Sequence, residues 1–493
     1  PEGGKFEPPH HDYARDLDIF GKASLYQYTN RTVSQQGNQL FASWLLSPAD
    51  NKTLLMRQSA LKELSIQPAW RQQLQAYGME DGIRQETEEK IHGWMNKENR
   101  FVQKQYWKIL QFLLPLAALL SLLLHITGIL DAAWFYLALF VFFSASLYIS
   151  KLVMPEYRLL NKIAAEVETL SHSIRHIEAT QFESSLLKEL KNRFQRGDKN
   201  SSALVRELKS ILDRLDYRLN PLVFIPLNTF FFWDLQQVMA LEKWKEKNKG
   251  LPEGWIAALA EMECLASLAN LAFNHPHWCF PGFTEEQGIF ISEELGHPLI
   301  EEDKRVSSNF STQGPAQISL ITGSNMAGKS TFLRSVGVNT VLAMAGGPVC
   351  AKKLLISNLR VISSMRVNDN LEESTSTFYA ELKKLKYIIE SVNRKEKVLL
   401  LLDEILRGTN SADRHTGSTA LIRQLVQHGA VGLVATHDLE LARLEQEHPS
   451  HIHNYHFDVQ VENEELFFDY LLKKGVCTSM NASLLMKKIG IEL

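Results

Sequence analysis

The sequence lacks several features that would assign it to a protein class at once. Its 53 lysines and arginines are outnumbered by 56 aspartates and glutamates, so the formal net charge is −3. A contact with nucleic acid would therefore need a local basic patch. The four cysteines form no Cys-x-x-Cys pair, which argues against a zinc site or a disulfide framework and is typical of a reducing compartment. No signal peptide is visible, and because the first residue is Pro1 we expect further residues before it.

Charge is absent from two long segments. Ile109–Ile126 and Ala132–Ile149 each run for 18 residues without Asp, Glu, Lys or Arg. A helix of that length spans about 27 Å, close to the hydrocarbon thickness of a bilayer. The sequence therefore predicts a transmembrane helical hairpin at 107–153. The alternative, which Pro115 and His125 favour slightly, is a hairpin buried inside a large soluble protein.

Positive charge flanks this hairpin on both outer sides. Lys104 and Lys108 precede it, and Lys151, Arg158 and Lys162 follow it. Flanking lysines and arginines are typical of the cytoplasmic side of a membrane. We therefore expect both soluble parts in the cytoplasm and the short turn outside.

Glycine is absent between Pro155 and Arg196, and the pattern up to Lys249 is charged and helical. We expect Pro221 and Pro226 to end a long helix. The segment is locally basic, with acidic residues interleaved. Its basic residues are Lys188, Lys191, Arg193, Arg196, Lys199, Arg206, Lys209, Arg214 and Arg218. A solvated face with ion pairs is favoured, and a phosphate-binding surface stays open as the alternative.

The last two fifths of the chain alternate strand-like and helical runs, which indicates an α/β domain with a mostly parallel sheet. The sequence thus predicts a multidomain protein in which an all-α region with a hydrophobic helical hairpin precedes an α/β P-loop domain. The expected parts are 1–106 (helical), 107–153 (hairpin), 154–284 (helical) and 285–493 (α/β).

A phosphate-binding loop follows the short apolar strand Ile318–Ile321. The run Gly323-Ser324-Asn325-Met326-Ala327-Gly328-Lys329-Ser330 fits GxxxxGK[ST] at every fixed position. The glycines let backbone N–H groups face the phosphates, the lysine supplies a full charge, and the serine hydroxyl binds Mg²⁺. We therefore predict an ATP and Mg²⁺ site. The residues expected to bind the nucleotide are Gly323, Asn325, Met326, Gly328, Lys329, Ser330 and Thr331.

Two carboxylates end an apolar run about 70 residues later. Val398–Leu402 predicts a strand buried on both faces, and Asp403 and Glu404 follow it. We expect Asp403 to bind Mg²⁺ together with Ser330, and Glu404 to orient and deprotonate the attacking water, while Lys329 stabilises the transferred phosphoryl group.

A histidine ends a further apolar strand, Ala430–Ala435. His437 is expected to report on the γ-phosphate and so to take part in catalysis. A surface histidine without a function is the alternative.

Several of these runs resemble MutS-family proteins. TGSNMAGKSTFLRSVG (322–337), DEILRGTN (403–410) and the Ala-Thr-His of 435–437 are similar to that family's ATP loop, Asp-Glu strand end and histidine strand end. STSTFYAE (374–381) resembles the segment that sends a serine across a dimer to the partner's γ-phosphate. The resemblance implies a homodimer with composite ATP sites, to which Ser376 and Thr377 contribute.

The resemblance is specific at 318–440 and looser elsewhere. Residues 16–48 resemble the start of the MutS core, and 255–272 resemble its lever. The hydrophobic hairpin makes the chain most similar to membrane-anchored bacterial MutS-like proteins, which implies the inner membrane of a bacterium. Within residues 1–493 we find no counterpart of the mismatch-reading domain or of the terminal helix-turn-helix, so the resemblance leaves open whether mismatches are recognised.

Three functions remain open from the sequence. The first is a membrane-tethered dimeric ATPase whose nucleotide state opens and closes a clamp around DNA or another partner. The second is half of an ABC-type transporter, although two spans are few for a translocation path and no LSGGQ-type signature is present. The third is a membrane scaffold that binds ATP without hydrolysing it, and Glu404 argues against this one.

Overall fold

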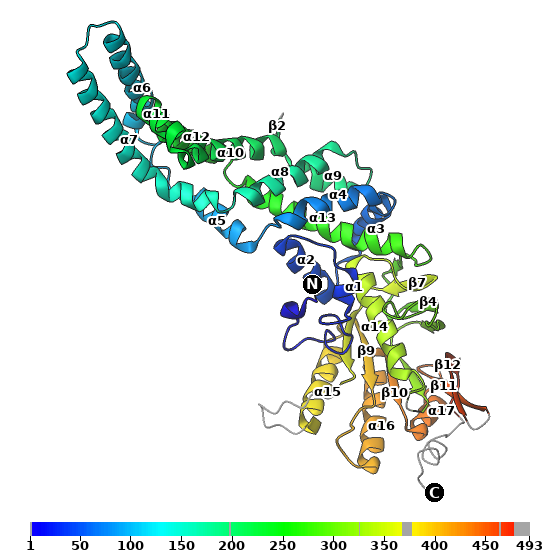
Figure 1. The fold of residues 1–493 in the computed structure, drawn as a ribbon. Coiled ribbons are helices and arrows are strands. Elements are labelled where there is room, and N and C mark those ends of the chain that lie inside the picture. The colour runs from blue at the N-terminus through cyan, green and yellow to red at the C-terminus, as the bar shows by residue number, and fades with distance from the viewer. Residues whose placement is uncertain (1, 197–198, 325, 367–376, 463–464, 478–493) are drawn as a thin grey trace. The chain divides into compact units, whose positions relative to one another are not determined.

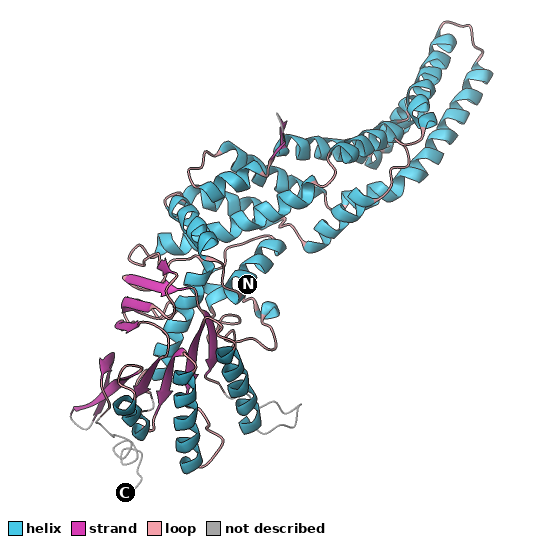
Figure 2. Ribbon diagram, turned by 180° about the vertical axis from the view of Figure 1, so that it is seen from behind, coloured by secondary structure: helices cyan, strands magenta, loops and turns pink. Residues whose placement is uncertain are grey.

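The computed structural model describes the chain apart from residues 1, 197–198, 325, 367–376, 463–464 and 478–493. It divides into two compact units. The helical unit comprises Arg31–Asn38 and Ala69–Cys264, and the sheet unit comprises Pro1–Asn30, Gln39–Pro68 and Leu265–Leu493. Figure 2 shows that nearly all strands belong to the sheet unit. The predicted order of a helical region followed by an α/β region is confirmed.

The helical unit consists mainly of long helices joined by short turns (Figure 1). Its elements are α4 (Pro68–Glu80), α5 (Gln85–Asn96), α6 (Gln105–Ile126), α7 (Ala132–Asn161), α8 (Ala164–Ala179), α9 (Ser185–Asn192), β1 (Gln195–Arg196), β2 (Lys199–Asn200), α10 (Ser201–Leu215), η2 (Asp216–Leu219), α11 (Pro221–Phe231), α12 (Trp233–Lys247) and most of α13 (Leu251–Asn274).

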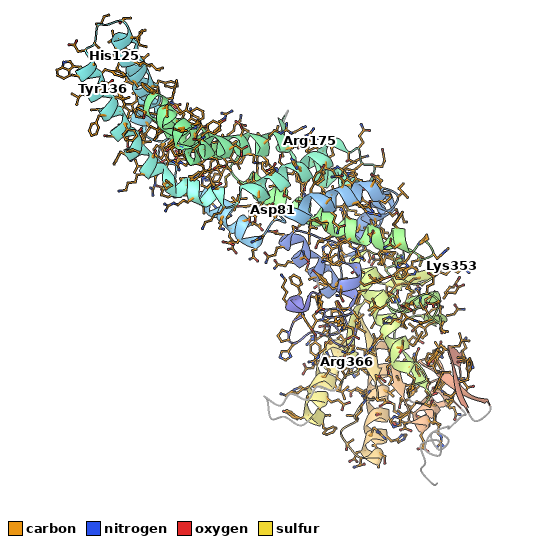
Figure 3. The ribbon with its side chains drawn as sticks, in the orientation of Figure 1. Asp81, His125, Tyr136, Arg175, Lys353 and Arg366 are labelled. Carbon is orange, nitrogen blue, oxygen red and sulfur yellow. The ribbon has the colours of Figure 1, made fainter. Side chains whose placement is uncertain are left out.

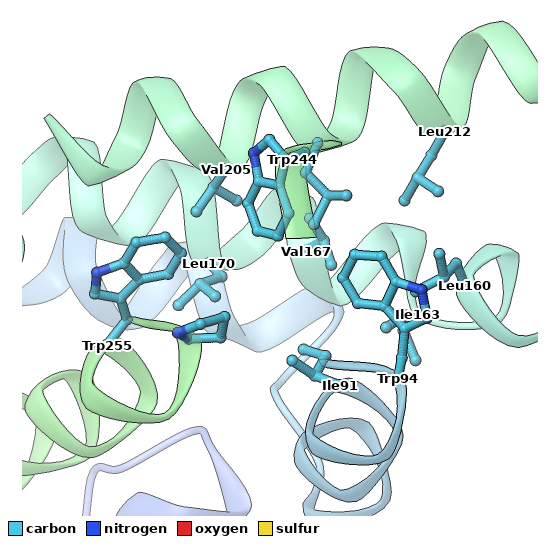
Figure 4. Close-up of a pocket in the computed structure, with 12 residues that line it drawn as sticks. Ile91, Trp94, Leu160, Ile163, Val167, Leu170, Val205, Leu212, Trp244 and Trp255 are labelled. Atoms are coloured by element: carbon cyan, nitrogen blue, oxygen red, sulfur yellow. The ribbon is translucent and has the colours of Figure 1, made fainter. Parts of the chain in front are cut away.

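Three tryptophans and aliphatic side chains form the interior of this unit. The rings of Trp94 and Trp244 are stacked, with centroids 6.0 Å apart. Together with Trp255 they border a cavity of about 20 Å³, and α8 and α10 add residues such as Val167 and Val205 (Figure 4). A cavity this small holds at most a water molecule, so these residues are a packed core.

Ion pairs hold several of the basic residues in this region. Lys209 lies 3.0 Å from Glu168 and 3.1 Å from Asp213, and Arg193 lies 2.9 Å from Glu189. For these residues the predicted ion-paired helix face is confirmed.

The uncharged segments form a hairpin of α6 and α7, joined at residues 127–131. Their most apolar windows are only 11% and 17% buried, so this chain does not cover the hairpin. Near the turn, where His125 and Tyr136 lie, side chains project around both helices (Figure 3). The alternative of a hairpin buried within the chain is therefore wrong for the described residues. Length and composition would also let α13 cross a membrane, but 67% of its most apolar window is buried.

The expectation that Pro221 and Pro226 end a long helix is wrong for both. The helix α10 ends at Leu215 and the 3-10 helix η2 ends at Leu219, and Pro221 begins α11 instead of ending a helix. Proline suits the first turn of a helix because it has no N–H to leave unbonded there, and the Asn220 side chain caps the same end. Pro226 lies inside α11.

A buried carboxylate ties the residues just before α2 (Gln35–Leu46) to α13. Glu263 accepts hydrogen bonds from Ser34 Oγ at 2.6 Å, from Ser34 N at 3.1 Å and from Val33 N at 3.3 Å. Burial raises the pKa of Glu263 to about 7, against the opposing effect of these hydrogen bonds. A Cβ on Gly37 would lie 2.3 Å from this carboxylate, so only glycine fits there.

The sheet unit contains two sheets. The larger has the order β12-β11-β6-β10-β9-β8, parallel except for β12, and the smaller has the order β3-β7-β4-β5. Their strands are β3 (Gly282–Thr284), β4 (Phe290–Leu295), β5 (Ser308–Thr312), β6 (Gln317–Thr322), β7 (Lys353–Ser357), β8 (Arg360–Ser364), β9 (Val398–Asp403), β10 (Val431–Thr436), β11 (Ile452–Glu462) and β12 (Glu465–Lys474). The unit's helices are η1 (Gly4–Phe6), α1 (Leu25–Thr29), α2 (Gln35–Leu46), α3 (Asn51–Ser65), α14 (Lys329–Ala345), α15 (Thr377–Asn393), α16 (Ser411–Gln427), η3 (Leu439–Arg443) and α17 (Leu444–Glu447).

Helices cover both faces of the larger sheet. On one face Leu400 and Leu402 of β9 pack in a core with Ile388 of α15 and Ile422 of α16. On the other face lies α14, which packs against β8, β9 and β10. Burial on both faces explains why β9 is apolar at every position up to its terminal carboxylate.

Candidate functional site

The loop between β6 and α14 has several backbone conformations in the left-handed region. Gly323 has φ 149° and Gly328 has φ 108°, conformations that favour glycine. A Cβ on Gly323 would lie 2.8 Å from the Phe457 carbonyl oxygen. Met326 also has a positive φ, of 71°, and its side chain is 80% exposed. Asn325, predicted to bind the nucleotide, lies outside the described residues.

Lys329 places its ammonium group inside this loop. Its Nζ donates hydrogen bonds to the carbonyl oxygens of Gly323 at 2.7 Å and Ser324 at 2.8 Å. Burial lowers the pKa of Lys329, whereas the nearby carboxylates of Glu404 and Asp403 raise it. The lysine is therefore pre-positioned at the start of α14, where the helix dipole also favours an anion.

Asp403 lies beside the same helix start. It ends β9, and parallel strands bring their carboxyl ends to one edge of the sheet, where β6 also ends. Burial raises the pKa of Asp403, and the neighbouring Ser330 hydroxyl and the charge of Arg407 partly offset this effect. The two residues predicted to bind Mg²⁺ thus lie next to each other.

Glu404, the residue after β9, has an unusual backbone conformation. Its φ is 50°, and its N–H donates to the Ala435 carbonyl oxygen of β10 at 2.9 Å. Its carboxylate lies 3.5 Å from His437 Nδ1 and 3.4 Å from Arg407 Nε. The structure therefore brings Glu404 and His437 together from two neighbouring strand ends.

A pocket of about 430 Å³ opens in front of the loop. Among the predicted residues, Met326, Gly328, Lys329, Ser330, Thr331 and Glu404 line it. Apolar and aromatic side chains form much of the remaining wall, which includes Leu295, Ile300, Val306, Phe332, Phe457 and Tyr470. One wall thus offers cationic and hydrogen-bonding groups for an anion, and another offers a surface for a flat apolar group.

Glu381 of α15 is a residue that the sequence analysis did not single out. Its carboxylate accepts a hydrogen bond from the Leu406 N–H. Burial raises the pKa of Glu381, although this bond, the charge of Arg407 and the nearby N–H groups of Arg407 and Gly408 lower it. It links α15 to the turn that follows Glu404. Ser376 lies outside the described residues, as does the side chain of Thr377, which begins α15.

Three further residues near the pocket were missed. Arg407 donates from Nε to the Glu404 carbonyl oxygen at 3.1 Å and from Nη2 to that of Asp403 at 3.1 Å. Burial and the charge of Arg334 lower the pKa of His297, which lines the pocket, to about 4. Tyr470 reaches the pocket from β12. Of these three residues, only Arg407 could have been found from the sequence, because it lies close after Asp403 and Glu404.

The donor set fits magnesium. Within the described parts of the chain, no three or more His, Cys, Asp and Glu side chains are grouped to hold a metal ion. One carboxylate and one hydroxyl, Asp403 and Ser330, are what Mg²⁺ needs from a protein when phosphate oxygens and water complete its shell.

Comparisons with known proteins identify relatives of this region. Residues 319–488 match the family model described as MutS domain V. The DNA mismatch repair protein MutS of Clostridium kluyveri is 30% identical over 313 residues, which cover 61% of this chain and 34% of that protein. MutS protein homolog 4 of Homo sapiens is 30% identical over 248 residues, covering 46% of this chain and 26% of the human protein. The MutS of Aquifex pyrophilus is 35% identical over 221 residues, covering 44% of this chain and 25% of that protein. The chain spans about a third or less of the length of these relatives.

Proposed function

We propose that this chain is a MutS-family protein and that its α/β region, 285–493, binds ATP with Mg²⁺ and hydrolyses the γ-phosphate. One observation carries the proposal. Lys329, Ser330 and Glu404 line one pocket in front of the glycine loop, and Asp403 is close enough to Ser330 and Lys329 to interact with both. A triphosphate needs this combination of cation, metal ligands and base at one place.

Each residue has a separate role in this reaction. The loop N–H groups and Lys329 bind the phosphates, and Lys329 stabilises the charge that develops on the transferred group. Ser330 and Asp403 would hold Mg²⁺, which supplies further positive charge to the phosphate oxygens. Glu404 orients the attacking water and accepts its proton, and His437, 3.5 Å from that carboxylate, responds to the γ-phosphate.

Two copies of the chain complete the sites in this proposal. Ser376 and Thr377 belong to the stretch that resembles the segment which reaches a partner's γ-phosphate. Glu381 supports such a role, because it couples α15 directly to the turn after Glu404. A contact between the start of α15 and the partner's γ-phosphate would thereby affect the position of Glu404.

The hairpin of α6 and α7 anchors the protein in a membrane, and the soluble parts face the cytoplasm. The exposure of the hairpin supports this part of the proposal, since both apolar windows are more than four-fifths uncovered. We propose the inner membrane of a bacterium as the location. ATP-driven opening and closing of the helical region would then act on DNA or another partner close to the membrane.

DNA remains a proposed partner. Its test is the ATP turnover of the detergent-solubilised protein with and without duplex, branched and single-stranded DNA, at stated salt concentrations. We expect turnover that requires Mg²⁺ and changes with one of these DNAs. If turnover is the same with and without each DNA, DNA is not the partner. If no condition gives turnover, the proposed ATPase activity is wrong.

A further inference from the structure

A second apolar surface lies outside the hairpin. It is formed by α11 and by Leu219, two residues before it. No charged residue occurs from Leu219 to Trp233. Leu219, Leu222 and Ile225 are 71%, 87% and 48% exposed, and Val223 is 42% exposed. Large apolar side chains gathered in this way mark a contact with another molecule or with a membrane.

This surface continues the surface of the hairpin. The short helix packs against both α6 and α7, and Figure 1 shows it alongside them. At its carboxyl end the ring of Phe232 meets Phe142 of α7 edge-on, with centroids 6.4 Å apart. The exposed face of α11 and the exposed faces of the hairpin therefore adjoin within one unit.

Polar contacts fix the level of α11 along α7. Asn228 Nδ2 donates to Ser150 Oγ at 2.9 Å, and Ser150 Oγ donates to Asp234 Oδ2 at 2.5 Å. The ion pair of Arg218 with Asp234, also 2.5 Å, is almost fully buried.

The guanidinium of Arg218 also lies over the rings of Tyr157 and Phe224, 4.5 Å and 5.7 Å from their centroids. The bond between Asn228 and Ser150 therefore sets the level of α11. Phe224 lies on the side toward Tyr157, and Phe232 on the side toward Phe142.

This register places the two ends of α11 at different depths. The uncharged run of α7 ends at Ile149, next to the level of Asn228. The aromatic carboxyl end of α11 lies beside the uncharged run. The exposed leucine and isoleucine of its first turns lie just beyond that run, where the headgroups of the cytoplasmic leaflet are expected.

The amino end of α11 is built for an environment with little water. Pro221 has no N–H, and the Leu222 N–H donates to Asn220 Oδ1 at 3.1 Å. The N–H groups of Val223 and Phe224 donate to the Asn220 carbonyl oxygen at 3.1 Å and 2.9 Å. The donors that a helix start usually leaves to water are thus bonded internally, as insertion into lipid requires.

We propose that α11 is a third membrane element, an interfacial helix whose face at Leu219, Leu222 and Ile225 sits in the cytoplasmic leaflet. The inference rests on the proposed anchoring by the hairpin. Its ligand is the lipid bilayer at the boundary of headgroups and acyl chains. Three helices instead of two would then fix the helical unit at the membrane surface.

The test measures the depth of single positions in vesicles. The protein, with Cys279 changed to Ser because the other three cysteines are buried, receives one bimane-labelled cysteine and is reconstituted in phosphatidylcholine vesicles. The test positions are Leu222→Cys and Ile225→Cys. Leu116→Cys, on the exposed side of α6, is the lipid control, and Glu207→Cys, exposed on α10, is the water control.

Three quenchers separate the outcomes: lipids brominated near the headgroup, lipids brominated near the middle of the acyl chain, and iodide in the water. We expect Leu222→Cys and Ile225→Cys to lose fluorescence mostly to the shallow bromines, and Leu116→Cys mostly to the deep ones. If only Leu116→Cys responds to lipid, α11 is not a membrane element, although the anchoring stands. Labels on α11 shielded from both lipid and iodide would mean that protein covers them, which also overturns the inference. If Leu116→Cys does not respond to lipid, the anchoring fails and the inference fails with it.

Discussion

The buried carboxylate of Glu263 should make the stability of the helical unit depend on pH. Glu263→Gln keeps an oxygen that can accept the Ser34 hydrogen bonds but removes the titrating group. Burial holds the pKa of Glu263 at about 7 instead of 4.5. Each pKa unit corresponds to about 1.4 kcal/mol, so ionising this group in the folded protein costs about 3 kcal/mol more than in the unfolded chain.

The direction of this pH dependence follows from proton binding by the folded and unfolded chain. Between pH 4.5 and about pH 7 the folded protein holds a proton on Glu263 that the unfolded chain has released. The contribution of Glu263 to the free energy of unfolding is therefore highest below pH 4.5, falls as the pH rises toward about 7, and is level above that.

Denaturant unfolding followed by tryptophan fluorescence measures this effect, since Trp255 is on the same helix as Glu263. We expect the difference in unfolding free energy between wild type and Glu263→Gln to change by about 3 kcal/mol from pH 4.5 to pH 8. Glu261→Gln, on the same helix but partly exposed, is the matched control and should show no comparable change. A difference that stays constant with pH would refute the reasoning.

Other predictions concern the membrane, the dimer and the support of the site. The protein should pellet with membranes and resist carbonate, and the variant without residues 109–149 should be soluble and still bind ATP; carbonate release of the intact protein would contradict anchoring. ATP with Glu404→Gln should trap dimers, and Ser376→Ala should lower turnover with little change in ATP affinity; a trapped monomer in size-exclusion chromatography would contradict composite sites. Replacing His437 with Ala should leave ATP binding intact while slowing hydrolysis, and lost affinity in an equilibrium binding assay would assign it a different role. Glu381→Gln weakens a charge-assisted hydrogen bond to the turn after Glu404, worth about 1.5–3 kcal/mol, so turnover should fall while ATP affinity holds; unchanged steady-state turnover would show that this link is not needed.

The two carboxylates proposed for catalysis could be predicted from sequence because their positions follow from strand geometry. A run that is apolar at every residue must be buried on both faces, and its carboxyl end must lie beside the end of β6. Asp403 and Glu404 were therefore identifiable without coordinates. The hairpin was identifiable for a similar reason, since uncharged runs of that length leave few alternatives.

Residues that act on backbone atoms could not be predicted. Glu381 binds an N–H group of a turn 25 residues away, and no pattern in side chains records such a bond. Tyr470 and His297 reach the pocket from elements whose placement depends on the whole sheet unit. The role of Pro221 could not be predicted because a proline that ends one helix and a proline that begins another look alike in the sequence.

ATP binding and turnover in three proteins test the central claim most directly. Wild type should hydrolyse ATP only with Mg²⁺. Lys329→Ala should lose both affinity and turnover, because the lysine contacts phosphate in the ground and transition states. Glu404→Gln should bind ATP as wild type does and turn over about 10²–10⁴-fold more slowly, the range for loss of a general base. If Glu404→Gln loses ATP affinity as severely as Lys329→Ala, or if wild type does not hydrolyse ATP, the assignment of this pocket is contradicted.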